Sequence, residues 1–249
     1  MSQPAVAALA PLPFELVLDD GEPLETDWHT LELPLLRHLI RQGMAEQGRT
    51  DFFVGANIFV YYSVKQAWDV AEEVRKGGEQ RAFRSPDVFW VGGVDPDRER
   101  EAWIAWEEGG RLPDVIVEML SPKTAKKDRT EKKDLYAQVF GTAEYFLYDP
   151  MTRTLEGFRL AGRSYRPLQP DENGRLWSEQ WGLYLGLWHG VVEGKRDEWV
   201  RLFRPDGSLV PTRDEAEQHR AEAAQQRAEA AEAEVARLKA LLAERSRHG

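Results

Sequence analysis

The chain of 249 residues lacks cysteine, long apolar runs and any excess of positive charge. Without cysteine it can form neither disulfides nor thiolate metal sites, and an intracellular, cytoplasmic protein is the simpler interpretation. No apolar run approaches the roughly 18 residues of a membrane-spanning helix, so we expect no membrane association. Residues 1–12 lack the basic region and the long apolar stretch of a signal peptide.

The net charge of −10 argues against a protein that coats nucleic acid non-specifically, because such proteins are usually basic. The net charge does not exclude a nuclease with a local basic patch, since such a site depends on the local electrostatic field and on a bound metal. The sequence contains no Walker loop, no G-x-G-x-x-G and no H-E-x-x-H motif, and its five histidines show no zinc spacing.

What the chain does contain is ample core material, with 42% hydrophobic residues, nine Trp, ten Phe and seven Tyr. We expect a flexible lead over residues 1–20, one domain over 21–205 and a separate helix over 213–248. Within the domain we predict two N-terminal helices, a central lysine-rich helix and several strands. The helices are expected over 26–44, 67–76 and 126–140, and the strands over 52–62, 88–91, 115–120, 144–148, 157–160, 165–168, 183–187 and 199–203. This order predicts a mixed α/β sheet with a helix covering one face.

Two of these strands begin with the same Pro-Asp pair and carry the candidate acids. Asp87 precedes Val88–Val91 in the first, and Glu118 interrupts the apolar strand Val115–Leu120 in the second. Alternation places Glu118 on the same face as Ile116, where an uncompensated carboxylate is costly. A cation or a bound metal is the usual compensation. A turn aspartate at Asp87 and a solvent-facing glutamate at Glu118 are the alternatives.

Asp114 opens the second strand and competes with Glu118 for the same role. The two share a face but lie about 13 Å apart along an extended strand, so one metal cannot bind both. We therefore interpret Asp114 as a strand-opening residue and Asp87 as the better partner for Glu118.

The lysine-rich helix offers the cation. An apolar stripe of Leu135, Tyr136 and Val139 predicts the face of this helix that meets the sheet, and counting back along it gives Lys132 and then Asp128. Lys132 is therefore the lysine expected beside Glu118, although a lysine can also extend along the helix to solvent. An acid, a second acid and a lysine at one sheet edge suit metal-dependent phosphodiester cleavage.

The last segment differs in composition, with much Ala, Glu and Arg and neither Gly nor Pro between Arg213 and His248. Its apolar residues recur at spacings of three and four, which predicts a heptad seam and a homo-oligomer through residues 213–248. The seam consists of Ala221, Ala224, Ala228, Ala231, Val235, Leu238 and Leu242. Alanine buries little area, so a single helix that does not self-associate is the alternative.

Four motifs, in order, resemble the Uma-type restriction endonuclease family, a branch of the PD-(D/E)XK nuclease superfamily. They are Phe83-Arg84-Ser85-Pro86-Asp87-Val88-Phe89, Pro113-Asp114-Val115-Ile116-Val117-Glu118-Met119-Leu120-Ser121-Pro122, Glu131-Lys132-Lys133-Asp134-Leu135-Tyr136 and Gly141-Thr142-Ala143-Glu144-Tyr145-Phe146-Leu147-Tyr148-Asp149-Pro150. The resemblance covers about residues 26–187 and implies a restriction-endonuclease-like fold, with a mixed central sheet flanked by helices.

The resemblance further implies an endonuclease acting on nucleic acid, with DNA as the expected substrate. Asp87, Glu118 and the Met119 carbonyl would bind Mg²⁺, or Mn²⁺ in its place, and a lysine would assist the attack of water. The sequence departs from the superfamily at Leu120, where lysine is usual, and Lys132 matches the family's helix lysine. The alternative is a catalytically inactive nuclease-fold module that binds or regulates and oligomerises through its C-terminal helix.

Overall fold

The computed structural model describes residues 12–17, 26–77 and 84–247, with side chains as far as residue 239. Residues 1–11 and 18–20 of the predicted lead lie outside this range. Contacts divide the chain into two units, Met1–Leu209 and Val210–Gly249. None of the described helices is long and apolar enough to cross a membrane.

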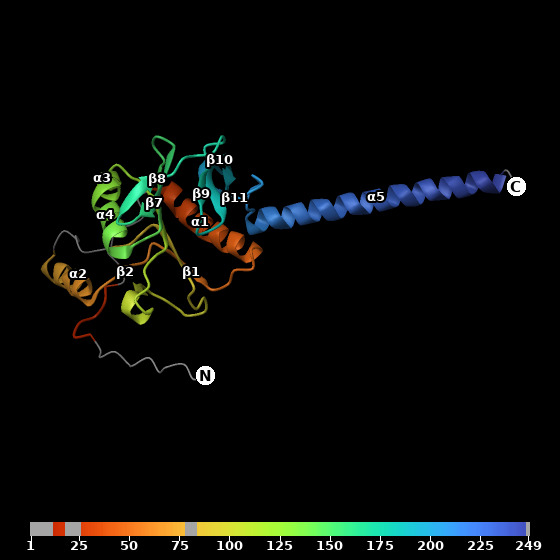
Figure 1. Cartoon of the computed structure of the whole chain (residues 1–249). Coiled ribbons are helices and arrows are strands. Elements are labelled where there is room, and N and C mark those ends of the chain that lie inside the picture. The colour runs from red at the N-terminus through yellow and green to blue at the C-terminus, as the bar shows by residue number, and fades with distance from the viewer. Residues whose placement is uncertain (1–11, 18–25, 78–83, 248–249) are drawn as a thin grey trace. The chain divides into compact units, whose positions relative to one another are not determined.

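A mixed sheet of six strands forms the centre of the first unit, in the order β1-β3-β5-β6-β7-β8. Figure 1 shows the whole chain, with β1, β7 and β8 of this sheet labelled. Its strands are β1 (Phe52–Ala56), β3 (Val88–Gly92), β5 (Val115–Met119), β6 (Glu144–Asp149), β7 (Thr154–Ala161) and β8 (Ser164–Pro167). The strands β5 and β6 run parallel and the other neighbours antiparallel. This confirms the predicted mixed α/β sheet.

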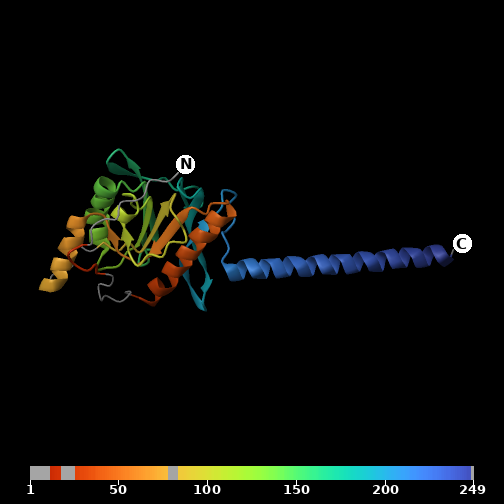
Figure 2. The ribbon, with the colours of Figure 1, turned by 90° about the horizontal axis from the view of Figure 1, so that it is seen from below.

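The helix α1 (Asp27–Glu46) covers one face of the sheet, as Figure 2 shows. Thr26 caps it by accepting a hydrogen bond from the His29 N–H, as such N-terminal threonines commonly do. Trp28 packs between Tyr148 of the sheet and Trp199 of a second sheet, with ring centroids 5.3 and 6.0 Å away. The helix continues through Pro34, although proline removes one helical hydrogen bond and commonly kinks a helix.

The second sheet has three antiparallel strands in the order β11-β10-β9. They are β9 (Leu176–Ser178), β10 (Leu183–Val192) and β11 (Lys195–Phe203). It is joined to α1 through Val200, whose N–H donates to the buried Glu32 carboxylate. A helix between two sheets buries apolar side chains on both of its sides, which explains its wide apolar stripe.

The predicted strand over 52–62 is wrong in extent, because the chain forms two strands there. Asn57 adopts a left-handed conformation at φ 50°, which asparagine tolerates better than most residues, and it ends β1. The short strand β2 (Val60–Tyr61) then pairs in parallel with β4 (Trp103–Ile104). The helix α2 (Val64–Lys76) follows, slightly longer than predicted.

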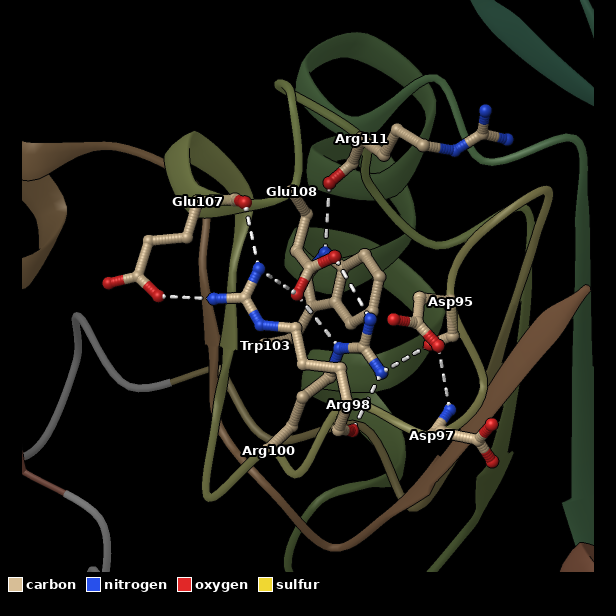
Figure 3. A network of polar contacts seen from close by, with 8 residues as sticks. All are labelled: Asp95, Asp97, Arg98, Arg100, Trp103, Glu107, Glu108 and Arg111. Atoms are coloured by element: carbon tan, nitrogen blue, oxygen red, sulfur yellow. Dashed lines mark hydrogen bonds and ion pairs between the residues drawn. The ribbon is translucent and has the colours of Figure 1, made fainter. Parts of the chain in front are cut away.

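The segment between β3 and β5 is ordered by a polar network around the buried Trp103 (Figure 3). Arg100 donates two hydrogen bonds to Glu108 and lies over the Trp103 ring, and the Trp103 indole donates to the Arg111 carbonyl. Arg98 binds Glu107 in the 3₁₀ turn η1 (Ala105–Glu107). Most of this polar segment is exposed, and the buried Trp103, which stacks on Phe53 of β1, anchors it to the sheet.

The lysine-rich helix covers the other face of the sheet and contains two π-helical turns. Its consecutive parts are α3 (Ala125–Lys127), η2 (Asp128–Lys132), α4 (Lys133–Leu135) and η3 (Tyr136–Phe140). Gly141 ends it in the left-handed conformation at φ 66°, which glycine adopts without strain.

The predicted buried stripe of this helix is partly wrong, since Val139 is 50% exposed and the buried apolar residues are Tyr136, Ala137 and Phe140. A π turn contains more residues than an α turn. The residues that face the sheet therefore recur at a longer spacing than the 3.6 residues per turn that the sequence analysis assumed.

The second unit contains the helix α5 (Arg213–Arg247), which confirms the predicted C-terminal helix. In this single chain Val235 and Leu238 of the proposed seam are each half exposed. The predicted coiled coil stays a prediction.

A candidate active site at the Asp87–Glu118 strand pair

The antiparallel pairing of β3 and β5 brings the two predicted acids together. Val88 lies opposite Val117, so Asp87 and Glu118 occupy facing positions one residue further along. The Met119 N–H donates to Asp87 Oδ2 at 2.6 Å, and the Asp87 N–H lies 3.4 Å from Glu118 Oε2. Both side chains belong to the face that carries Phe89 and Ile116, beneath the lysine-rich helix.

Lys132 reaches this pair from the helix, as the sequence predicted. Its Nζ lies 3.0 Å from Glu118 Oε1 and 2.8 Å from Asp128 Oδ1. The Lys132 side chain is 15% exposed and the two carboxylates 1% each, so this ion pair is shielded from water. In such surroundings charges interact far more strongly than at a surface.

Two further residues complete the cluster, and the sequence analysis gave neither a role in the site. Tyr136 donates its hydroxyl to Glu118 Oε1 at 2.8 Å, and Asp128 binds Lys132 from one helical turn away. The backbone carbonyl of Asp128 in turn accepts a hydrogen bond from the Tyr145 hydroxyl on β6. The signal was present in the spacing, because Asp128, Lys132 and Tyr136 recur at intervals of four on one helix face.

The cluster is out of charge balance, since three carboxylates face a single ammonium group. Burial raises the pKa of Glu118 to about 8, with Asp128 and Asp87 adding to the rise and Lys132 opposing it. Burial also raises the pKa of Asp87, against the effects of Lys132 and of the Met119 N–H. Burial lowers the pKa of Lys132, but Glu118, Asp128 and Asp87 together raise it above its ordinary value. Lys132 therefore carries its charge at neutral pH.

Leu120 and Asp114, which flank Glu118 along the chain, contribute to packing and backbone hydrogen bonding rather than to the cluster. Leu120 occupies the position where the superfamily usually has a lysine, and it is buried in the apolar cluster on the same face as Glu118. The ammonium group comes from Lys132 instead. Asp114 accepts a hydrogen bond from the Gly92 N–H at 2.9 Å, at the opposite end of β5, as a strand-opening residue would.

The donor set suits a hard divalent cation in chemistry, because Asp87, Glu118 and the Met119 carbonyl all offer oxygen. The excess of negative charge in a buried place favours such an ion as well. Among the residues that the structure describes, no three acidic or histidine side chains are arranged as a metal site. A cation here would thus have two carboxylate ligands, with the rest from backbone and water.

Comparison with known proteins gives a family. The family model Uma2, described as "putative restriction endonuclease", matches residues 21–192, which is more than half of the chain. The match includes all the residues of the cluster, and the mixed sheet flanked by helices is consistent with a restriction-endonuclease-like fold. No curated protein matches the chain.

Proposed function

Because the chain belongs to the Uma2 family, we propose that it is a metal-dependent endonuclease that hydrolyses phosphodiester bonds in nucleic acid at the Asp87–Glu118–Lys132 cluster. The observation that carries the proposal is the buried excess of carboxylates beside one lysine. Buried carboxylates with a raised pKa beside a charged partner are typical of functional sites, where a cation or a phosphate compensates the charges.

Asp87, Glu118 and the Met119 carbonyl would hold Mg²⁺, or Mn²⁺ in its place. When bound, such an ion lowers the pKa of a coordinated water and neutralises charge that develops on phosphate oxygens. The rest of the chemistry falls to side chains of this chain.

Lys132 acts as a charged hydrogen-bond donor rather than as a base, because its neighbours keep it protonated. Its ammonium group orients the attacking water or stabilises the charge on a non-bridging phosphate oxygen. In the reaction a water oxygen forms a bond to phosphorus and the ester P–O bond opposite it breaks. The water proton passes to solvent, and the leaving oxygen takes up a proton.

Asp128 and Tyr136 position the groups that react. Asp128 holds the Lys132 ammonium through an ion pair of 2.8 Å, and Tyr136 fixes one oxygen of Glu118. Because Glu118 Oε1 already accepts from two donors, a cation would use Glu118 Oε2 and the Asp87 carboxylate, each of which has one backbone N–H contact. Such preorganisation is what a catalytic site needs from the residues around it.

The second candidate function is a catalytically inactive nuclease-fold module, which the buried Leu120 and the acidic net charge favour. Cleavage of plasmid, single-stranded DNA and RNA by highly purified protein in Mg²⁺ or Mn²⁺ separates the two. We expect cleavage by the wild type and its loss in Asp87→Asn and Glu118→Gln. Asp114→Asn is the matched control, an acid on the same strand that should keep most of the activity.

Absence of cleavage by the wild type with either metal would favour the inactive module. A loss in Asp114→Asn as large as in Glu118→Gln, with all variants folded, would contradict the assignment of the site to the Asp87 end of the strands.

A further inference from the structure

A cavity of about 570 Å³ lies beside the candidate active site, between α2 and the segment that leads into β3. Its lining includes Tyr62, Trp68 and Arg84. Arg84 precedes Asp87 by three residues, so an extended chain puts their Cα atoms about 10 Å apart. The volume is within the range of small-ligand pockets, about 300–1,000 Å³.

The aromatic side of the cavity is partly exposed. Trp68 is 47% exposed, although Phe14 packs edge-on against it with ring centroids 5.2 Å apart. Tyr62 contacts Phe140 at 5.4 Å, and Phe140 in turn packs against Tyr136, the residue that binds Glu118. The cavity therefore adjoins the apolar layer on which the acid cluster rests.

Arg84 adds positive charge to the lining of the cavity. Arg84 is an electrostatic neighbour of the half-buried Lys127, and Lys127 is a neighbour of Lys132. Burial, Arg84 and Lys132 all lower the pKa of Lys127, against the opposite effects of Glu131 and Asp128. Arg84 of the lining, Lys127 and Lys132 are therefore near enough to interact, and Lys132 contacts Glu118, so the region offers positive charge for a phosphate backbone.

The acidic side chains of the lining lie on α2. They are Asp69, Glu72 and Glu73. Asp69 forms an ion pair with Lys65 at 2.6 Å, and Glu72 pairs with Lys76 at 2.7 Å. Carboxylates there repel a phosphate but can accept hydrogen bonds from the exocyclic amines of a base. A phosphate would therefore be favoured on the Arg84 side of the cavity rather than beside α2.

We propose that this cavity binds one unstacked nucleotide of the substrate, with its base against Trp68 and Tyr62 and its phosphate towards Arg84 and Lys127. The proposal rests on the proposed nuclease function and names its substrate class, which is single-stranded or locally unpaired nucleic acid. An aromatic platform accepts any base, because every base has a π face.

The test is binding of a short fluorescent oligothymidylate, and of a duplex of equal length, measured by anisotropy in Ca²⁺ buffer. Trp68→Ala should weaken binding of the single strand about tenfold, the effect of losing one base–aromatic contact, and weaken duplex binding less. Val74→Ala is the matched control, an exposed residue of the same helix outside the lining, and should bind like the wild type. Arg84→Gln should reduce the slope of log affinity against log salt by about 0.7.

Single-strand binding by a folded Trp68→Ala that equals wild-type binding would overturn the proposal, and so would a wild type that binds neither probe. In the first case, metal-dependent cleavage by the wild type would leave the nuclease function standing. The expected loss on Trp68→Ala, in a protein that cleaves nothing, would instead support the cavity as a binding site and refute the nuclease.

Discussion

Replacing Glu118 by glutamine is expected to stabilise the metal-free protein at pH 8, although the change removes an ion pair. Burial raises the pKa of Glu118 to about 8 in the folded protein, against a pKa of 4.5 for a freely solvated glutamate. A carboxyl with a higher pKa in the folded state binds more protons there than in the unfolded state. The free energy of unfolding therefore falls as the pH rises from about 4.5 to about 8. Glutamine resembles the protonated acid and does not titrate.

The size of the effect follows from the same values. The difference between the two pKa values corresponds to at most about 5 kcal/mol, at about 1.4 kcal/mol for each pH unit. Relaxation of the site and entry of water reduce such penalties, so we expect about 2–3 kcal/mol at pH 8 and close to zero at pH 4.5. For a unit of this size that is a gain in Tm of about 4–12 °C at pH 8.

The assay is thermal unfolding of wild type and Glu118→Gln in EDTA at several pH values between 4.5 and 8.5. Glu144→Gln is the matched control, because Glu144 is equally buried but is satisfied by Arg159, Ser178 and the Glu179 N–H. That variant should lose about 1.5–3 kcal/mol at pH 7, as expected for lost hydrogen bonds to a charged group. A Glu118→Gln variant that is less stable than the wild type at pH 8 would refute the charge imbalance.

Two further predictions concern the lysine-rich helix and the C-terminal helix. Lys132→Ala should lower cleavage about 100-fold or more, the usual cost of losing a charge-stabilising donor. Lys133→Ala should cost little, because Lys133 lies over the Phe158 ring, away from Glu118. Equal losses in the two variants would mean that the wrong lysine is assigned. Removal of residues 213–249 should leave a folded monomer, and Leu238→Asp with Leu242→Asp should lower the oligomer mass in light scattering. An unchanged mass would reject the coiled coil.

The central part of the site could be predicted from the sequence because strands repeat every two residues. The two strands begin with the same Pro-Asp pair, which placed Asp87 at the start of one strand and Glu118 within the other. Side-chain alternation then placed Glu118 on an apolar face of the sheet. The structure adds what no local pattern contains, namely the register that sets Asp87 opposite Glu118. Register depends on pairing between segments far apart in the chain.

The helix was harder to predict, because its π turns change the spacing of buried residues. Counting back from Val139 used a residue that is exposed, yet it arrived at Lys132, since steps of four remain on the inner face of a widened helix. The spacing placed Asp128 on the face towards the sheet but did not predict that its carboxylate would be buried beside Lys132. Its burial depends on the packing of the helix against Tyr145 of β6, which only the tertiary structure provides.

The most direct test of the central claim is a crystal structure of the protein soaked in Mn²⁺, with anomalous difference density calculated at the acid cluster. We expect a peak between the Asp87 and Glu118 carboxylates, within ligand distance of the Met119 carbonyl, and no peak in Asp87→Asn crystals soaked in the same way. An empty cluster at saturating Mn²⁺, or a peak of equal height in Asp87→Asn, would contradict a metal-dependent nuclease site at these residues.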